Sequence, residues 1–441
     1  MHSKLVVMLA GGMLAVPLGV QAEPFAYVTN AFAPSVSVID TANNQIAATI
    51  AFPPGSTPIA AAITPDSRKV YVTSLDAFTT CGADDGVFVI DAASNTVAAG
   101  PIAVECEPTA IGITPDGKLA YVASQLGGMI SVIDTATDAV SATIPLPNGE
   151  GIAHLAISPD GQRVYATVLA GTSIIVIDTS SNTVLEPAID VGFNPAGIAI
   201  SPDGNQIYVT NAGASGGVAV IDAATGTVVA TIAVDNHPSA VAFAPDGLWA
   251  YVTQAGMNSG GEFTISKIDT ASSAVVGDPI EVGNFPTSIA ITADGMQAYV
   301  GNERSNTVSV IDTADDSVAL TLSGMNSPRG IAASATPAGH QVPSVVGETE
   351  FDATFILNSS GLAVGSVTTE VSSAVPSGRV ISQNPQADTF LGSGAAVNLV
   401  VSSGRNGNGG GGGGGGAMGF GLLALMGLLS ASRMLRTRRI A

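Results

Sequence analysis

The sequence predicts an all-β fold, a seven-bladed β-propeller, followed by a small α+β domain. A tyrosine, followed by Val in six of its seven copies, recurs at spacings of 43 to 50 residues, and an Ile-Asp pair that ends a Val-rich segment also recurs seven times. The chain of 441 residues has 52 Gly, 25 Pro and 11% charged residues, a composition typical of short strands joined by turns. The repeated residues are Tyr27, Tyr71, Tyr121, Tyr165, Tyr208, Tyr251 and Tyr299, and Asp40, Asp91, Asp134, Asp178, Asp222, Asp269 and Asp312.

The N-terminal residues 1–22 have the pattern of a secretory signal peptide. Lys4 supplies the positive charge, residues 5–20 are apolar, and the sequence Val-Gln-Ala ends at Ala22 with small residues suited to cleavage. The alternative is a helix that stays uncleaved as an anchor.

Residues 23–339 contain the repeats, and each unit consists of four short β segments. In one unit these are AGIAIS, QIYVTN, GVAVID and TVVATI. Pro-Asp-Gly joins the first two segments, because Pro presets φ and Gly tolerates a positive φ in a tight turn. Four antiparallel strands every ~43 residues are typical of the blade of a β-propeller.

The phase of the repeats predicts how the ring closes. The chain opens on a second segment, FAYVTN from Phe25, and its repeats end on an unpaired first segment, RGIAAS from Arg329. The C-terminal strand should therefore complete the blade that the N-terminus began, which gives seven blades. A single unit cannot bury both faces of its sheet, but neighbouring units bury each other.

Three short motifs carry a resemblance to a known family. The YVTN of Tyr27–Asn30 and Tyr208–Asn211, the recurrent Pro-Asp-Gly and the VIDTA of Val132–Ala136 resemble the YVTN-type β-propellers over about residues 24–339. The resemblance implies an extracellular or surface protein, with relatives among lactonase-like and haem d1 propellers.

The chain has two cysteines, which we expect to form a disulfide. Cys81 lies in an insertion between a second and a third strand, and Cys106 lies before the next first strand. Both connections emerge on the same face of an up-and-down blade, and disulfides form in exported proteins. A metal site would need more ligands than these two.

The repeat motifs are absent from residues 342–404, where we expect one helix near 349–360 followed by three short strands. The segments VPSVVG, GLAVG, VPSGRVISQNP and GSGAAVNLVVS resemble a PASTA domain over its full length. The resemblance implies binding to peptidoglycan fragments or β-lactams. The alternative is a spacer that holds the propeller away from the membrane.

The C-terminus combines a Gly-rich linker, 405–416, with a tail, 417–441, that is apolar and ends in arginines. This order resembles the GlyGly-CTERM sorting signal, which implies cleavage and delivery to the cell surface or outer envelope of a Gram-negative bacterium. The alternative is a membrane tail, with the basic residues in the cytoplasm. Both interpretations place the folded part outside the cytoplasm.

The charge distribution excludes one class of partner. All 35 acidic residues but only eight of the 14 basic residues lie in residues 23–404, so this part has a formal charge of −27. A surface this acidic repels phosphate backbones, and nucleic acid is therefore not expected as a partner.

No catalytic or metal-binding motif stands out, and we expect neither a metal nor a cofactor. A better indication of a functional site is a residue that differs in type from the residues at the equivalent position of the other repeats. His154 replaces Ala, Gly or Ser in a first strand, near the mouth of the central channel. The candidate binding residues at this mouth are His154, His237, Glu107, Asn194, Arg304 and Arg329.

Three functions follow from these features. The first is a binding or scaffold module at the cell envelope, whose partner is an envelope or extracellular protein, a glycan or peptidoglycan. The second is a lactonase-like hydrolase that uses the channel mouth, with His154 for proton transfer and Arg for an oxyanion. The third is a peptidoglycan-binding protein that acts through the PASTA-like domain.

Overall fold

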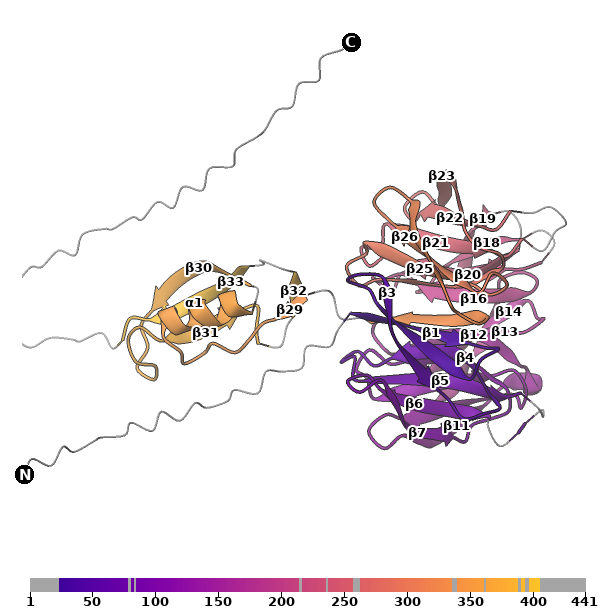
Figure 1. Ribbon diagram of the computed structural model, residues 1–441, viewed down its shortest axis with the longest axis horizontal. Coiled ribbons are helices and arrows are strands. Elements are labelled where there is room, and N and C mark those ends of the chain that lie inside the picture. Colours follow the sequence, from indigo (N-terminus) through magenta and orange to yellow (C-terminus); the bar gives the residue numbers. More distant parts are fainter. Residues whose placement is uncertain are drawn as a thin grey trace, which may run out of the picture.

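The computed structural model describes residues 24–404 apart from 78–80, 83–84, 214–215, 235–236, 257–261, 335–338, 361, 388–389 and 393–395. It contains seven four-stranded antiparallel sheets, which confirms the predicted seven-bladed propeller, and a smaller α+β unit (Figure 1). The expected signal peptide, Gly-rich linker and sorting tail lie outside the described residues. No helix in the described part of the chain has the length and apolar character needed to cross a membrane.

Each blade runs from an innermost strand at the channel to an outermost strand at the rim, and we number the blades in chain order. Blade 1 is β28 (Pro328–Ala333), β1 (Phe25–Asn30), β2 (Ser35–Asp40) and β3 (Gln45–Ala51). Blade 2 is β4 (Ser56–Ile63), β5 (Lys69–Asp76), β6 (Gly86–Asp91) and β7 (Thr96–Ile102), and blade 3 is β8 (Pro108–Ile113), β9 (Leu119–Ser124), β10 (Met129–Asp134) and β11 (Ala139–Pro145). A 3-10 turn, Pro147–Gly149, leads to blade 4, which is β12 (Ile152–Ile157), β13 (Arg163–Val168), β14 (Ser173–Asp178) and β15 (Thr183–Asp190).

The remaining blades repeat this order. Blade 5 is β16 (Pro195–Ile200), β17 (Gln206–Asn211), β18 (Gly217–Asp222) and β19 (Thr227–Ala233), and blade 6 is β20 (Pro238–Phe243), β21 (Trp249–Gln254), β22 (Thr264–Asp269) and β23 (Ala274–Glu281). Blade 7 is β24 (Pro286–Ile291), β25 (Gln297–Asn302), β26 (Thr307–Asp312) and β27 (Ser317–Ser323).

Strand β28 closes the ring as the phase of the repeats predicted. It pairs antiparallel with β1, with Val28 opposite Ile331 and Tyr27 opposite Ala332. In Figure 1 the last part of the propeller, in orange, therefore lies beside its first part, in indigo. The closed ring leaves no blade with an unpaired innermost strand.

The Pro-Asp-Gly turns between the first and second strands have the expected geometry. Gly117 takes φ 72°, and the Asp116 carboxylate accepts hydrogen bonds from the Thr114 hydroxyl at 2.7 Å and the Lys118 amide at 3.1 Å. These hydrogen bonds favour the charged carboxylate and lower the pKa of Asp116 to about 2. These turns define one face of the propeller, the PDG face. The opposite face carries Cys81 and Cys106, and we call it the disulfide face.

In five blades, all except those of Tyr165 and Tyr208, the tyrosine of the second strand donates a hydrogen bond to the following blade. Its target is the residue with positive φ in the turn between the third and fourth strands, here called the turn residue. The Tyr121 hydroxyl donates to Asn182 at 2.8 Å, and Tyr299 donates to Asn44 across the closure of the ring. Burial first, and then the charge of Asp178, raise the pKa of Tyr121 to about 12. The turn residues are Asn44, Asn95, Asp138, Asn182, Gly226, Ser273 and Asp316.

In blades 1, 4 and 5, a threonine from the second strand ties neighbouring innermost strands together. The Thr210 hydroxyl accepts from the Gly197 amide of its own blade at 2.8 Å and donates to the Ser239 carbonyl of the next blade at 3.2 Å. Blades 3 and 7 lack this threonine, and there Thr109 and Thr287 of the innermost strand donate to the next blade instead.

Thr210→Val is expected to lower the free energy of unfolding by about 1–3 kcal/mol, because the buried Gly197 amide loses its acceptor. Denaturant unfolding monitored by circular dichroism measures the change. Thr231→Val, an exposed position of β19 in the same blade, is the matched control and should stay within about 0.5 kcal/mol of the parent. Equal effects of the two substitutions would contradict the role assigned to Thr210.

The smaller unit contains β29 (Gly339–Gln341), α1 (Glu350–Ser359), β30 (Ala363–Glu370), β31 (Val380–Asn384), β32 (Phe390–Gly392) and β33 (Ala396–Ser402). Thr349 caps the helix, with its hydroxyl accepting from the Asp352 amide at 3.1 Å. Val345, Leu357, Val397 and Leu399 belong to its buried core. The helix that the sequence predicted near 349–360 is thus present, but four strands follow it where three were predicted.

Candidate functional site

The innermost strands surround a central channel with a cavity of about 570 Å³. Two successive residues of these strands form rings around it. One ring is apolar and contains Ala61, Ile111, Leu155, Ile198, Val241, Ile289 and Ile331. The other, the His154 ring, contains Ala60, Ala110, His154, Gly197, Ala240, Ser288 and Gly330. His154 is therefore one imidazole among six small residues.

His154 lies far from the outer surface of the propeller. Its side chain lines the central channel and is exposed to the space inside it. Its amide donates to the Thr167 hydroxyl at 3.0 Å, which fixes the backbone that carries the ring. Burial disfavours the charged imidazolium and lowers the pKa of His154 below its usual value of 6.5. The lowered pKa favours the uncharged imidazole, which has one nitrogen able to donate and the other to accept.

An ion pair lies at the mouth of the channel on the disulfide face. The Arg329 guanidinium of blade 1 contacts the Glu303 carboxylate of blade 7 at 3.2 Å, and both residues border the cavity. Arg329 is 42% exposed and Glu303 only 12%, so the guanidinium retains donors that a ligand can reach. Blade 4, with His154, lies on the opposite side of the ring.

Phe285 borders the cavity next to this ion pair. The guanidinium carbon of Arg304 lies 4.2 Å from the centre of the Phe285 ring, which is a cation–π contact. Arg304 itself is exposed and does not border the cavity.

The predicted disulfide between Cys81 and Cys106 is present, with the Cα atoms 4.8 Å apart. Asp85 lies within the loop that the disulfide closes and organises its surroundings. Its carboxylate accepts from the Asp76 amide at 2.6 Å and from the Glu107 amide at 3.3 Å. The disulfide and Asp85 thus fix the approach to the third blade on this face.

His237, Glu107 and Asn194 share one position, but they do not gather around the channel. Each has a φ of 54–60°, and its carbonyl accepts a hydrogen bond from the residue after the second strand, as between Glu107 and the Gln125 amide at 2.9 Å. The His237 Nδ1 lies 2.8 Å from the Ala212 carbonyl oxygen. None of the three borders the cavity, so the structure brings together His154 and Arg329 from the predicted set.

Three residues at the channel were missed by reasoning from the sequence. Glu303, Gln125 and Phe285 border the cavity from connections outside the innermost strands. The repeat alignment contains a signal for two of them, because Gln125 and Glu303 both directly follow a second strand. In the described ranges, no group of three or more His, Cys, Asp or Glu residues could hold a metal ion.

The fold and the channel define a closed seven-bladed propeller with a ligand-sized central cavity. The chain matches the family described as "Lactonase, 7-bladed beta-propeller" over residues 38–332 and the PASTA domain over residues 340–403. It therefore belongs to this family of seven-bladed propellers, and it carries a PASTA domain.

Several solved structures are similar to this chain in fold. A functionally unknown protein from Desulfotomaculum acetoxidans DSM 771 is 19% identical, with a TM-score of 0.60, covering 70% of this chain and 98% of its own. A putative 6-phosphogluconolactonase from Bacteroides fragilis is 16% identical, with a TM-score of 0.57 and coverages of 72% and 99%. A chain of Kuenenia stuttgartiensis hydrazine synthase is 21% identical, with a TM-score of 0.55 and coverages of 64% and 92%. At these identities the likeness concerns the fold alone.

Proposed function

We propose that the protein is an exported binding module of the cell envelope, which takes a small ligand with a carbonyl or carboxylate group into the mouth of its channel. The observation that supports this most is the single imidazole of His154 in a ring of small residues. Ala, Gly and Ser leave the room that a ligand needs, and His154 supplies a polar group at one side. Polar groups placed at defined points around a cavity fix the orientation of a small ligand.

Arg329 would supply the second recognition group. Its guanidinium already contacts Glu303, and its remaining N–H donors can bind a carbonyl or carboxylate oxygen. A ligand oriented by His154 on one side and Arg329 on the other would span the channel.

A second candidate function is hydrolysis of a lactone at the same site. The lowered pKa of His154 favours it, because a general base must be unprotonated at the working pH. His154 would accept a proton from the attacking water, and Arg329 would stabilise the negative charge that develops on the carbonyl oxygen. Membership of the lactonase propeller family is consistent with this chemistry.

His154→Ala is expected to weaken binding of a channel ligand at least about tenfold, or to reduce lactone hydrolysis about a hundredfold or more. Calorimetry with gluconate measures the first and pH-stat titration with gluconolactone measures the second. His237→Ala is the matched control, because His237 does not border the cavity. If both substitutions leave binding and hydrolysis unchanged, the channel is not the functional site.

The PASTA domain and the disulfide support an envelope location, since disulfides form outside the cytoplasm. We propose that residues 342–404 contact peptidoglycan or another envelope partner while the propeller binds its own ligand. The sorting tail would deliver the protein to the surface. Retention of the full chain on purified sacculi, lost when residues 342–404 are deleted, is the result that this proposal requires.

A further inference from the structure

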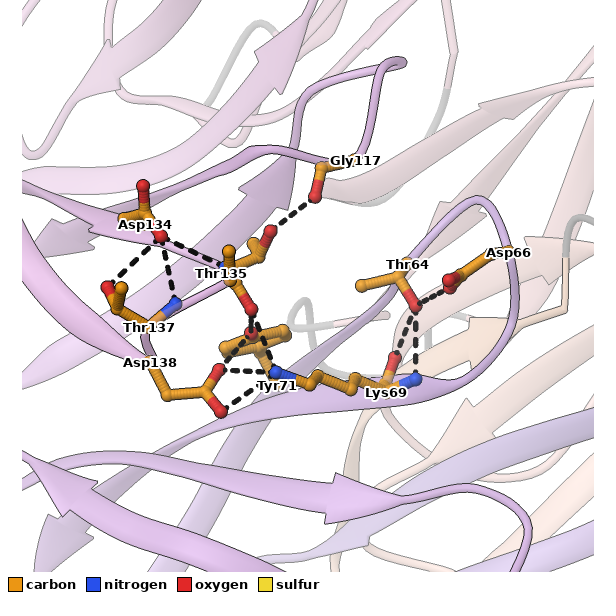
Figure 2. Close-up of polar contacts among 10 residues, drawn as sticks. Thr64, Asp66, Lys69, Tyr71, Gly117, Asp134, Thr135, Thr137 and Asp138 are labelled. Atoms are coloured by element: carbon orange, nitrogen blue, oxygen red, sulfur yellow. Dashed lines mark hydrogen bonds and ion pairs between the residues drawn. The ribbon is translucent and has the colours of Figure 1, made fainter.

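At two interfaces between blades, a buried tyrosine and a lysine share the carboxylate of a turn residue. Between blades 2 and 3, the Lys69 Nζ lies 2.8 and 3.0 Å from the two carboxylate oxygens of Asp138, and the Tyr71 hydroxyl also donates to Asp138 (Figure 2). Burial first, and then the hydrogen bond to Asp138, raise the pKa of Tyr71. Here the carboxylate comes from the protein itself.

The interface between blades 6 and 7 repeats the arrangement with a lysine from another strand. Lys267 of β22 contacts the Asp316 carboxylate at 2.8 Å, and the Tyr251 hydroxyl donates to the same carboxylate at 3.0 Å. The cluster of cation, tyrosine and carboxylate therefore forms by two routes, and in both the turn residue supplies the acid.

Between blades 4 and 5 the cation and the tyrosine are present, but the acid is replaced by glycine. Arg163 and Tyr165 occupy the positions of Lys69 and Tyr71, and Gly226 occupies the position of Asp138. In the part of the chain that the structure describes, the Arg163 guanidinium has no ion-pair partner and the Tyr165 hydroxyl makes no hydrogen bond. The charge of Arg163 contributes to lowering the pKa of Asp160, but the Asp160 carboxylate accepts a hydrogen bond from the Ser158 hydroxyl at 2.6 Å and forms no ion pair with Arg163 in the described part of the chain.

A pocket of about 440 Å³ opens beside Gly226 and Arg163. Its walls include the outermost strand of blade 4, with Leu185, Pro187 and Ile189. A Cβ atom added to Gly226 would meet the Ile189 side chain at 3.4 Å, which is ordinary van der Waals contact. The missing side chain is therefore not explained by a lack of room.

We propose that this pocket, the Arg163 pocket, binds the carboxylate of an external ligand, which takes the place that Asp138 and Asp316 occupy at the other two interfaces. The guanidinium of Arg163 can bind both oxygens of a carboxylate in a forked geometry. The site lies at the rim of the propeller, away from the channel.

The walls of the pocket define the body of the ligand. They are mostly aliphatic, so the carboxylate should be attached to a short apolar chain. Asp190 also borders the pocket, but it is at the end of β15, whereas Arg163 lies level with the start of that strand. An acid with a single carboxylate directed toward Arg163 keeps its charge away from Asp190.

Hexanoate titrated calorimetrically into the full chain tests the proposal. We expect saturable binding of hexanoate and none of hexan-1-ol, which has the same body without the charge. Arg163→Gln and Gly226→Asp should each weaken binding at least tenfold, the second because its own carboxylate fills the site. Arg68→Gln, an exposed arginine of the PDG face, should leave the affinity unchanged.

Acetyl-leucine carries a carboxylate on a peptide-like body and is titrated in the same way. Whichever of hexanoate and acetyl-leucine binds with the higher affinity shows whether the natural carboxylate belongs to an aliphatic acid or to a peptide. Absence of saturable binding of both acids, or wild-type affinity in both Arg163→Gln and Gly226→Asp, would overturn the proposal. The reciprocal variant Asp138→Gly should open an equivalent site beside Lys69, and formate should therefore raise the melting temperature of this variant more than that of the parent chain, which has the Arg163 pocket alone. Failure of formate to do so would show that an external carboxylate cannot replace the turn residue.

Discussion

A chain that stops at Ser327 is expected to lose cooperative unfolding of the propeller, because strand β28 is then missing from blade 1. Strand β1 would become an open edge, with its backbone groups unpaired opposite Ile331 and Ala332. The Thr29 hydroxyl would also lose the Gly330 amide, which it binds at 2.8 Å. About five lost hydrogen bonds at roughly 1 kcal/mol each are comparable with the whole stability of many domains.

The matched control is a chain that ends at Gln341, which also lacks the PASTA domain but retains β28. Calorimetry should show a single sharp transition for the control and a broad or absent one for the shorter chain. Addition of a synthetic peptide with the sequence of residues 328–334 should restore the transition in part. Equal melting of the two truncated chains would contradict the role of β28 as the strand that closes the ring.

Replacement of both cysteines by serine is expected to lower the free energy of unfolding by about 3 kcal/mol. The disulfide joins residues 25 positions apart, and a cross-link over such a loop restricts the unfolded chain by roughly this amount. Urea unfolding of the double variant, compared with the parent chain under oxidising conditions, measures the loss.

The parent chain treated with a reducing agent is the control, and it should unfold at the same urea concentration as the double variant. Asp85 lies inside the closed loop and accepts hydrogen bonds from the Asp76 and Glu107 amides, which flank the loop. Hydrogen exchange at these two amides should therefore also become faster. A loss of less than about 0.5 kcal/mol would show that the loop is held by its other contacts.

The sequence was sufficient to predict the number of blades, because each unit contains two independent repeated signals, the tyrosine of the second strand and the Ile-Asp pair that ends the third. Tyr121, for example, marks a second strand and Asp134 marks the end of a third, and the two series agree. The sharp Pro-Asp-Gly turns were also predictable, since Gly117 needs a φ that other residues adopt rarely. Ring closure followed from the order of segments at the two ends of the repeat region.

The contacts between blades were not predictable, because they join residues far apart in the chain. Tyr121 and Asn182 are 61 residues apart, and no pattern in a single sequence connects them. The position shared by His237 and Glu107 was misleading for a different reason. It requires a left-handed backbone, which favours residues such as Asn194 for conformational and not for chemical reasons.

His154 was found because it departs from a column of small residues, and its place in the channel agrees with that reasoning. Glu303 was missed because the reasoning compared positions within the strands, whereas Glu303 directly follows a second strand. The exchange of Asp138 for Gly226 could have been read from the turn sequences, but its meaning depends on the three-dimensional positions of Lys69 and Arg163.

The contact from Tyr299 to Asn44 uses the same parts as the contacts between consecutive blades, although it joins the two ends of the repeat region. The junction is therefore not a chemically distinct seam. A circularly permuted chain, with new termini in another connection of the disulfide face, should keep every blade beside its usual neighbours. Duplication of a whole blade in the gene would likewise add a unit that brings a tyrosine and a turn residue of its own to the contact with its neighbours.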